Sequence, residues 1–119
     1  MNKSYLFGQE AEQRAVAYFK LLGFQILAKN FRFKRAEVDL IVKKHTLLVA
    51  VEVKARSTDY FGGPEQFVSQ KKINLLVMAM DLYIQSRDLE VELRFDIIGF
   101  TYQNAQWKLK HIENAFYGF

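Results

Sequence analysis

The stretch "AEVDLIVKKHTLLVAVEVKAR", residues 36–56, predicts two apolar strands joined by a short polar turn. Inside these strands stand Glu37, Asp39, Glu52 and Lys54. A charge among Val, Leu and Ile side chains must stay in water, be paired or hold a ligand, because burying it alone costs several kcal/mol or more. The hairpin therefore raises the question of what its charges do.

The segments on either side of the hairpin alternate between helical and strand patterns. Residues 5–22 carry apolar side chains at spacings of three and four, which predicts a helix, and Gly23 is placed to end it in a left-handed turn. A second helix is expected from Pro64 to about Gln85. Strands are expected at 24–32, 36–43, 47–55, 91–100 and 107–112. This order (α-β-β-β-α-β-β) predicts an α/β (α+β) domain with a mixed sheet flanked by helices.

The composition limits the class of protein. With 119 residues and 50% hydrophobic residues, the chain 1–119 suits a single domain with one core. The lack of cysteine excludes a disulfide framework and a thiolate zinc site, and it suits a reducing compartment, so a cytoplasmic location is expected. The longest apolar run, residues 75–80, is far below the roughly 20 residues of a membrane-spanning helix, so no membrane partner is expected. A net charge of +4 is compatible with nucleic acid as a partner.

The two carboxylates of the hairpin are predicted to be neighbours. For a turn near Lys44 and His45, the numbers of paired residues sum to about 89–91, and an odd sum puts Asp39 opposite Glu52 or one diagonal step away. Two carboxylates this close repel unless one keeps its proton or a cation lies between them. Lys54 partly supplies that cation, but oxygen ligands without His or Cys favour Mg²⁺ or Mn²⁺. An ordinary sheet face with solvated charges is the alternative.

A third carboxylate lies on the first predicted helix. Glu12 stands at the edge of the apolar face, near the small residues Gly8 and Ala15. This would leave room for Glu12 to approach the hairpin if the helix packs on the sheet. A solvated surface position is the alternative interpretation.

Three motifs resemble a known family. The stretches "AEVDLI" at 36–41, "VEVKAR" at 51–56 and "RFDIIGF" at 94–100 are similar to the bacterial YraN-like family, within a similarity that runs from about residue 8 to residue 100. Members of that family are predicted endonucleases of the PD-(D/E)XK type, distantly similar to archaeal Holliday junction resolvases. The resemblance implies a restriction endonuclease-like mixed β-sheet and metal-dependent hydrolysis of phosphodiester bonds in DNA, with branched or processed DNA as a candidate substrate.

The resemblance also implies a role for each site residue. Glu12 matches the acidic residue of the first helix, Asp39 the first metal ligand, and Glu52 with Lys54 the E-x-K pair. Asp39 and Glu52 would hold Mg²⁺ or Mn²⁺ directly, with the carbonyl of Val53 as a neighbouring ligand and Glu12 bound directly or through a water. Lys54 would orient the attacking water or stabilise the transition state. A non-catalytic nucleic-acid-binding module of the same fold is the alternative function.

Several basic residues are candidates for contacts with phosphates. The segment "KNFRFKR", residues 29–35, alternates cations with Phe31 and Phe33. This pattern suits phosphate contacts with a ring on a base, and equally a strand with one face in the core and the other solvated. The second helix brings two further lysines, either on a phosphate or on a solvated face. The nucleic-acid-binding candidates are Lys29, Arg32, Lys34, Arg35, Arg56, Lys71 and Lys72.

The remaining polar candidates receive structural interpretations. His45 and His111 lack a second histidine at ligand spacing, so both are interpreted as structural or surface residues. For Asp96 two interpretations stay open, a place in the polar site or a pair with the strand neighbours of Arg94.

The C-terminal segment is aromatic, with Phe116, Tyr117 and Phe119. Docking on the core of its own chain is the first interpretation, and a contact between subunits is the second. A homodimer is expected on functional grounds, because a cut in both strands of a duplex or junction needs two active sites.

Overall fold

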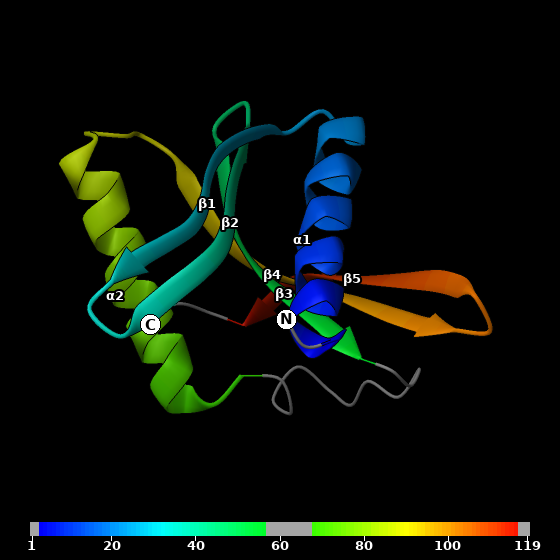
Figure 1. Ribbon diagram of the computed structural model, residues 1–119. Helices are drawn as coiled ribbons and strands as arrows, with labels where there is room; N and C mark the ends of the chain where they lie inside the picture. Colours follow the sequence, from blue (N-terminus) through cyan, green and yellow to red (C-terminus); the bar gives the residue numbers. More distant parts are fainter. Residues whose placement is uncertain (1–2, 57–67, 117–119) are drawn as a thin grey trace.

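A five-stranded mixed sheet forms the centre of the computed structural model, which describes residues 3–56 and 68–116, and a helix covers each face of the sheet (Figure 1). The elements are α1 (Lys3–Leu21), β1 (Gln25–Phe33), β2 (Ala36–Lys44), β3 (Leu47–Arg56), α2 (Gln70–Ser86), β4 (Glu92–Gln103) and β5 (Gln106–Phe116). The predicted order α-β-β-β-α-β-β and the α/β class with flanking helices are confirmed.

The strands lie in the sheet in the order of the sequence, β1-β2-β3-β4-β5. All neighbours are antiparallel except β3 and β4, which run parallel and are connected through α2. A parallel pair needs such a long crossover, since a short turn joins only antiparallel strands. Beyond the body of the sheet, β4 and β5 continue as a hairpin past α1 (Figure 1). In the described part of the chain, no helix is long and apolar enough to cross a membrane.

Each face of the sheet has its own hydrophobic core. Leu48 and Ala50 of β3 belong to the core on the α2 side, and Val49 and Val51 belong to the core on the α1 side. Alternate residues of β3 thus face opposite helices, as strand geometry predicts. The helices contribute Ala11, Ala15 and Phe19 from α1, and Leu76, Ala79, Met80 and Tyr83 from α2.

Strict alternation fails at one point of β2. Val38 and Ile41 are three residues apart, yet both pack in the α2-side core. Alternation would place them on opposite faces. The strand therefore shifts its side chains between Asp39 and Leu40. Asp39 does not share a face with Ile41, as strict alternation would require, and lines a hollow on the α1 side.

The end of α1 follows the sequence prediction. The helix ends at Leu21, and Gly23 adopts a left-handed φ of 91°. In this turn the amide of Phe24 donates to the carbonyl of Phe19 at 2.9 Å. Glycine takes such a φ without steric cost, which explains why the turn falls at this residue.

The start of α2 differs from the prediction. The helix begins at Gln70, and Ser69 before it is extended, with φ −74° and ψ 161°. The hydroxyl of Ser69 accepts a hydrogen bond from the amide of Lys72 at 3.1 Å. This cap satisfies an amide that a helix start leaves open, so it defines the first turn. Pro64, where the sequence predicted the start, lies outside the described residues.

The last two strands are longer than predicted. β4 extends to Gln103 and β5 to Phe116, and backbone pairing continues to the tip with Tyr102 opposite Trp107. The apolar pattern that set the predicted ends stops earlier, because the outer half of this hairpin is exposed along much of its length. Ladder hydrogen bonds do not require apolar side chains, so the strands continue.

Candidate active site

The odd hairpin register that the sequence allowed is confirmed. Leu40 pairs with Val51, so the numbers of paired residues sum to 91, and one further step would place Asp39 opposite Glu52. The backbone pairing of β2 with β3 ends at this point. There the Oδ2 atom of Asp39 accepts a hydrogen bond from the amide of Val53 at 2.7 Å. The Asp39 side chain thus accepts a hydrogen bond from β3 at a point where β2 no longer pairs with it through the backbone. This bond fixes the carboxylate against β3.

The two carboxylates influence each other strongly. The pKa of Asp39 is raised to about 8, first by burial and then by the neighbouring negative charge of Glu52, although the hydrogen bond from the Val53 amide lowers it. Like charges in a low-dielectric site cannot both ionise easily. Without a metal ion the pair therefore keeps a proton at neutral pH, even with two lysines beside Glu52.

Glu52 is satisfied at one oxygen and not at the other. The carboxylate is buried, with 6% of the residue exposed. Its Oε1 atom accepts a hydrogen bond from Lys72 Nζ at 2.9 Å and lies 3.8 Å from Lys54 Nζ. Its Oε2 atom is buried and has no hydrogen-bond partner within the described part of the chain. A buried carboxylate oxygen without a partner costs free energy, so this atom is a candidate ligand.

Lys54 lies in a setting that suits a reactive lysine. Its side chain is 17% exposed. Burial lowers the pKa of Lys54, although the Glu52 carboxylate raises it in part. A lysine desolvated in this way releases or directs a proton more easily than a surface lysine.

Glu12 reaches the same region from α1. A hollow of about 290 Å³ lies between the helix and the strands, with Glu12, Asp39 and Val53 in its wall. Burial raises the pKa of Glu12, and Glu37 adds to this effect while Lys29 opposes it. The predicted approach of the first helix to the hairpin is thereby confirmed, with small residues beside it as expected. The other lining residues are Gly8, Gln9, Ala11 and Ala55.

The described residues offer a metal ion the two carboxylates of the hairpin. Among residues 3–56 and 68–116, no three His, Cys, Asp or Glu side chains are arranged to hold a metal together, so Glu12 is not grouped with the hairpin pair as a direct ligand. The pair itself fits a hard cation, because Asp39 resists ionisation and Glu52 has an unpartnered oxygen. Magnesium sites usually need one or two carboxylates and complete their shell with water.

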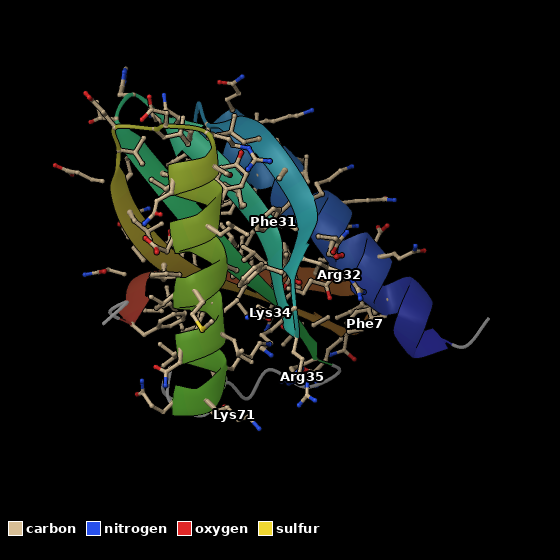
Figure 2. All side chains as sticks on the ribbon, turned by 90° about the vertical axis from the view of Figure 1, so that its left-hand side faces the viewer. Phe7, Phe31, Arg32, Lys34, Arg35 and Lys71 are labelled. Carbon is tan, nitrogen blue, oxygen red and sulfur yellow. The ribbon has the colours of Figure 1, made fainter. Side chains whose placement is uncertain are left out.

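The basic candidates differ in their surroundings. Arg32, Lys34, Arg35 and Lys71 are exposed, and Figure 2 shows Lys34, Arg35 and Lys71 toward the end of the molecule where β1 ends and α2 begins. Lys72 is different, because its ammonium group pairs with the buried Glu52. It belongs to the carboxylate site and is not a free surface cation.

The two other cations of the set lie apart from this end of α2. Arg56 is exposed at the end of β3, where its guanidinium group donates to the carbonyl of Ala55 at 2.9 Å. Lys29 is exposed on β1 and lines a groove beside α1. The phosphate contacts predicted for these cations stay predictions.

The rings of the "KNFRFKR" segment belong to the core. Phe31 and Phe33 pack against the α2-side core, and the Phe31 ring meets the Tyr83 ring edge-on at 5.2 Å. Of the two interpretations from the sequence, the strand with one face in the core is confirmed. These rings are thus packing residues and not stacking platforms for bases.

Asp96 forms a second buried centre that the sequence left open. Its carboxylate is fully buried and accepts from Arg94 Nε at 2.8 Å, from His111 Nε2 at 2.7 Å and from the amide of Asn114 at 3.0 Å. His111 Nδ1 lies 2.9 Å from the hydroxyl of Tyr18 on α1. Asp96 therefore pairs with Arg94 and its strand neighbours, and His111 is structural as predicted.

Sequence reasoning missed this network for a physical reason. Its members come from α1, β4 and β5, and Tyr18 and His111 are 93 positions apart. An aspartate two residues after an arginine gives no sign of a histidine on another strand. The polar Asn30 was also missed, although its left-handed φ of 53° matches the tolerance of asparagine for that region. His45, in the exposed β2–β3 turn, is a surface residue as predicted.

The tail contributes one described aromatic residue. Phe116 stacks on Phe95 with the ring centroids 5.0 Å apart, so docking on the core of its own chain is confirmed for this residue. Tyr117 and Phe119 lie outside the described residues.

Fold and site together define a small mixed α/β domain with a buried carboxylate pair and a partly buried lysine on its central hairpin. The model of the uncharacterised protein family UPF0102 matches residues 11–100, and the chain belongs to this family. It is 45% identical over 112 residues to a UPF0102 protein of Christiangramia forsetii, with 94% of each chain covered. A UPF0102 protein of Persephonella marina is 34% identical over 114 residues, with 95% of each chain covered.

Proposed function

We propose that this protein is a metal-dependent endonuclease that hydrolyses phosphodiester bonds in DNA. The observation that carries the proposal is that neighbouring cations and hydrogen-bond donors balance the negative charge of Asp39 and Glu52 only in part. Both lysines near Glu52 lie beside the same oxygen, Oε1, while Oε2 has no partner in the described chain and Asp39 keeps a raised pKa of about 8. A cation between the two carboxylates would relieve both conditions.

Asp39 and Glu52 are the residues that would hold Mg²⁺ or Mn²⁺, with the carbonyl of Val53 as a neighbouring ligand. When bound, such an ion supplies positive charge for the phosphoryl oxygens and makes a water molecule more acidic. The chain holds both carboxylates in place beforehand. The Val53 amide fixes Asp39 at 2.7 Å, and the Lys72 ammonium group fixes Glu52 at 2.9 Å. Such preorganisation is what electrostatic catalysis requires.

Lys54 and Glu12 would act on the reacting groups from two sides. Lys54 is mostly buried beside Glu52, and its ammonium group would direct the attacking water or stabilise negative charge on the phosphoryl group. Glu12 faces the hollow that also contains Asp39, where its carboxylate would orient a water. Both roles follow the assignments expected from the motifs.

DNA is proposed as the substrate because exposed cations stand on β1, in the turn after it and on α2, the elements next to the candidate site. Arg32, Lys34, Arg35 and Lys71 are exposed, and the chain carries a net charge of +4. Contacts between such side chains and phosphates release counterions, so the affinity for DNA should fall steeply as salt rises. Arg56 and Lys29 would extend the contact surface.

A homodimer that prefers branched DNA completes the proposal. The described part of one chain offers one such carboxylate pair, whereas symmetric cuts in two strands need two, and a two-fold dimer is the commonest way to supply them. Light scattering at micromolar protein, with binding to matched linear and four-way DNAs, tests both points. A monomer without structural preference would contradict the dimer and leave a nicking nuclease. The cytoplasm is the proposed location, since the chain has no cysteine.

The test of the main proposal is cleavage by purified protein with Mn²⁺. Linear, flapped and four-way DNAs and an RNA of matched sequence are compared, with chelator and Asp39→Asn as controls. We expect cleavage that needs the metal and disappears in Asp39→Asn. Cleavage that persists in chelator or in the variant would show that another activity is being measured.

A non-catalytic nucleic-acid-binding module is the second candidate, and the Lys72 contact favours it. An ammonium group 2.9 Å from Glu52 already neutralises part of the site. In this case the protein binds DNA with salt-dependent affinity, and neither Mn²⁺ nor Asp39→Asn changes that binding. Metal-dependent cleavage that Asp39→Asn abolishes excludes this candidate.

A further inference from the structure

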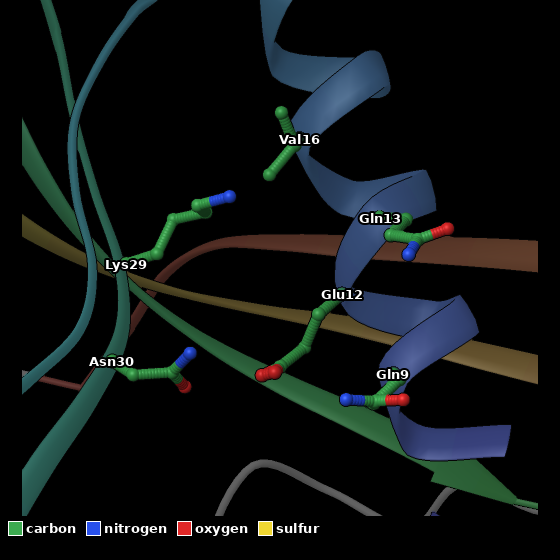
Figure 3. A pocket seen from close by; sticks show the side chains of 6 residues that line it. All are labelled: Gln9, Glu12, Gln13, Val16, Lys29 and Asn30. Atoms are coloured by element: carbon green, nitrogen blue, oxygen red, sulfur yellow. The ribbon is translucent and has the colours of Figure 1, made fainter. Parts of the chain in front are cut away.

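A groove of about 270 Å³ runs between α1 and β1, beside the carboxylate site (Figure 3). Figure 3 shows Gln9 and Glu12 reaching from the helix, and Lys29 and Asn30 reaching from the strand, toward the space between them. The remaining lining residues are Gln13 and Val16. β1 is an end strand of the sheet, so the groove lies at the sheet's edge.

The groove continues into the candidate active site. Gln9 and Glu12 line both the groove and the neighbouring hollow that contains Asp39 and Val53. The two spaces therefore meet at the Glu12 side chain. A molecule in the groove would lie directly beside any phosphate held at Asp39.

The charges in the groove do not suit a phosphate. One carboxylate, Glu12, stands with one ammonium group, Lys29, and the lysine partly offsets the raised pKa of Glu12. A phosphate in this space would gain one attraction and meet one repulsion. The lining instead favours a neutral group with both donors and acceptors.

A nucleobase is such a group. The ammonium group of Lys29 offers a donor for a base edge, and the Glu12 carboxylate and the oxygen of the Asn30 amide offer acceptors, in the way that lysine, glutamate and asparagine read bases. The methyl groups of Val16 and the aliphatic stem of Lys29 supply an apolar surface for a base face. A pocket of this size takes one base, and a paired base does not leave its helix without loss of stacking and pairing.

The site for the base edge is held by the backbone of β1. Asn30 adopts a left-handed φ of 53° in a strand whose register shifts between Ile26 and Ala28. With the amide turned to donate, Asn30 Nδ2 lies 3.1 Å from Glu12 Oε1 and 3.1 Å from Glu37 Oε1. The irregular strand thus aims this amide at the carboxylate shared by the two spaces.

We infer that the groove between α1 and β1 binds one unpaired base of the DNA next to the bond that is cut. The inference rests on the proposed function and names its substrate more closely. It predicts that the protein acts where a strand leaves the duplex, since only there is a base free to enter the groove.

The first experiment scans a flapped DNA with single abasic positions, using the complete protein with Mn²⁺. One abasic position near the cut should lower kcat/KM about tenfold, the scale of one lost base contact. Asn30→Gly keeps the left-handed φ available. On intact DNA this variant should lower kcat/KM by about the same factor as the abasic position does for wild type, and on the abasic DNA it should cause little further loss. Gln25→Ala, an exposed amide on the same strand outside the groove, should behave as wild type.

The outcomes separate this inference from the proposed function. Metal-dependent cleavage with equal rates at every abasic position would overturn the base site. So would losses from Asn30→Gly and from the abasic site that multiply when the two are combined. In both cases the nuclease proposal stands. Lys29→Ala repeats the test should Asn30→Gly lower the melting temperature.

A second measurement tests the groove without cleavage. Flapped DNAs with 2-aminopurine at each flap position in turn are bound with Ca²⁺ in place of Mn²⁺, and the fluorescence is recorded. A change on binding that Asn30→Gly removes supports the base site even if the protein cuts nothing. Emission that stays the same at every flap position overturns it.

Discussion

Two buried carboxylate centres lie on adjoining strands of this sheet, and they differ in how their charge is compensated. Asp96 lies opposite Val51 in the parallel pair of β3 and β4, one residue before Glu52. Both oxygens of Asp96 have partners. Oδ1 accepts from Arg94 Nε at 2.8 Å and from the Asn114 amide at 3.0 Å. Oδ2 accepts from Arg94 Nη2 at 2.9 Å and from His111 Nε2 at 2.7 Å. Glu52 has two cations on one oxygen and no partner on the other in the described chain.

The pKa values follow this difference. Burial alone would raise the pKa of Asp96, but hydrogen bonds from His111, Arg94 and Asn114 outweigh it and hold the pKa below its ordinary value. The pKa of Asp39 is raised to about 8 by burial and by Glu52. A satisfied buried carboxylate stabilises the fold, whereas an unsatisfied one stores free energy that a ligand releases. The comparison thus assigns the Asp96 centre to structure and supports the proposal that the hairpin pair binds a ligand.

The largest expected effect is on stability, from Asp96→Ala. Removing this carboxylate leaves Arg94 and His111 without their partner, and breaking a buried pair in this way costs about 3–5 kcal/mol of unfolding free energy. Urea denaturation measures it. Asp39→Asn is the matched control and should be neutral or stabilising, because Asp39 with a pKa of about 8 is mostly uncharged at neutral pH and the amide keeps that uncharged state beside Glu52. A loss from Asp39→Asn as large as that from Asp96→Ala would remove the distinction between the two centres.

Next comes catalysis by Lys54. Lys54→Ala should lower the cleavage rate about 10²-fold or more, as loss of one preorganised charge does, while DNA and metal binding remain. Single-turnover cleavage and fluorescence anisotropy give the two readouts. Lys110→Ala, an exposed lysine on β5, serves as the control. Equal rates in Lys54→Ala and wild type would point to a contaminating nuclease or to the binding module.

Metal binding should stabilise one centre only. At about 100 times its dissociation constant, Mn²⁺ should add about 2.7 kcal/mol to the unfolding free energy. Thermal melting with and without millimolar Mn²⁺ reports it for wild type and Asp39→Asn. The shift should vanish in the variant. A shift of equal size in both proteins would place the ion elsewhere.

The smallest effect is a pH dependence in chelator. Between the ordinary value of 3.8 and the folded value of about 8, folded Asp39 binds a proton that the unfolded chain has released. Stability should therefore fall as pH rises through this window, by at most about 1.4 kcal/mol per unit from this group. Asp39→Asn should flatten the slope in melts from pH 6 to 7.5. For Asp96 the sign is opposite, since its lowered pKa gives stability that is lost in acid.

The amino-acid sequence by itself determined the order of the elements and the hairpin pair. The polar turn near Lys44 and the odd register bring Asp39 and Glu52 close together from local pattern alone, because a hairpin joins strands that follow one another. The lysine two residues after Glu52 comes with the strand. Local rules missed the shift of side chains between Asp39 and Leu40, which follows from packing against two cores.

Only the tertiary structure decided which charges stay uncompensated. Lys72 reaches Glu52 across 20 positions, and His111 reaches Asp96 and Tyr18 from another strand. These contacts depend on where α2 and β5 pack, and no spacing in the sequence encodes that distance. Whether a buried carboxylate stabilises the fold or is free to bind a ligand depends on all of its hydrogen-bond and ion-pair partners. Most of these partners come from distant segments of the chain, which only tertiary packing brings together.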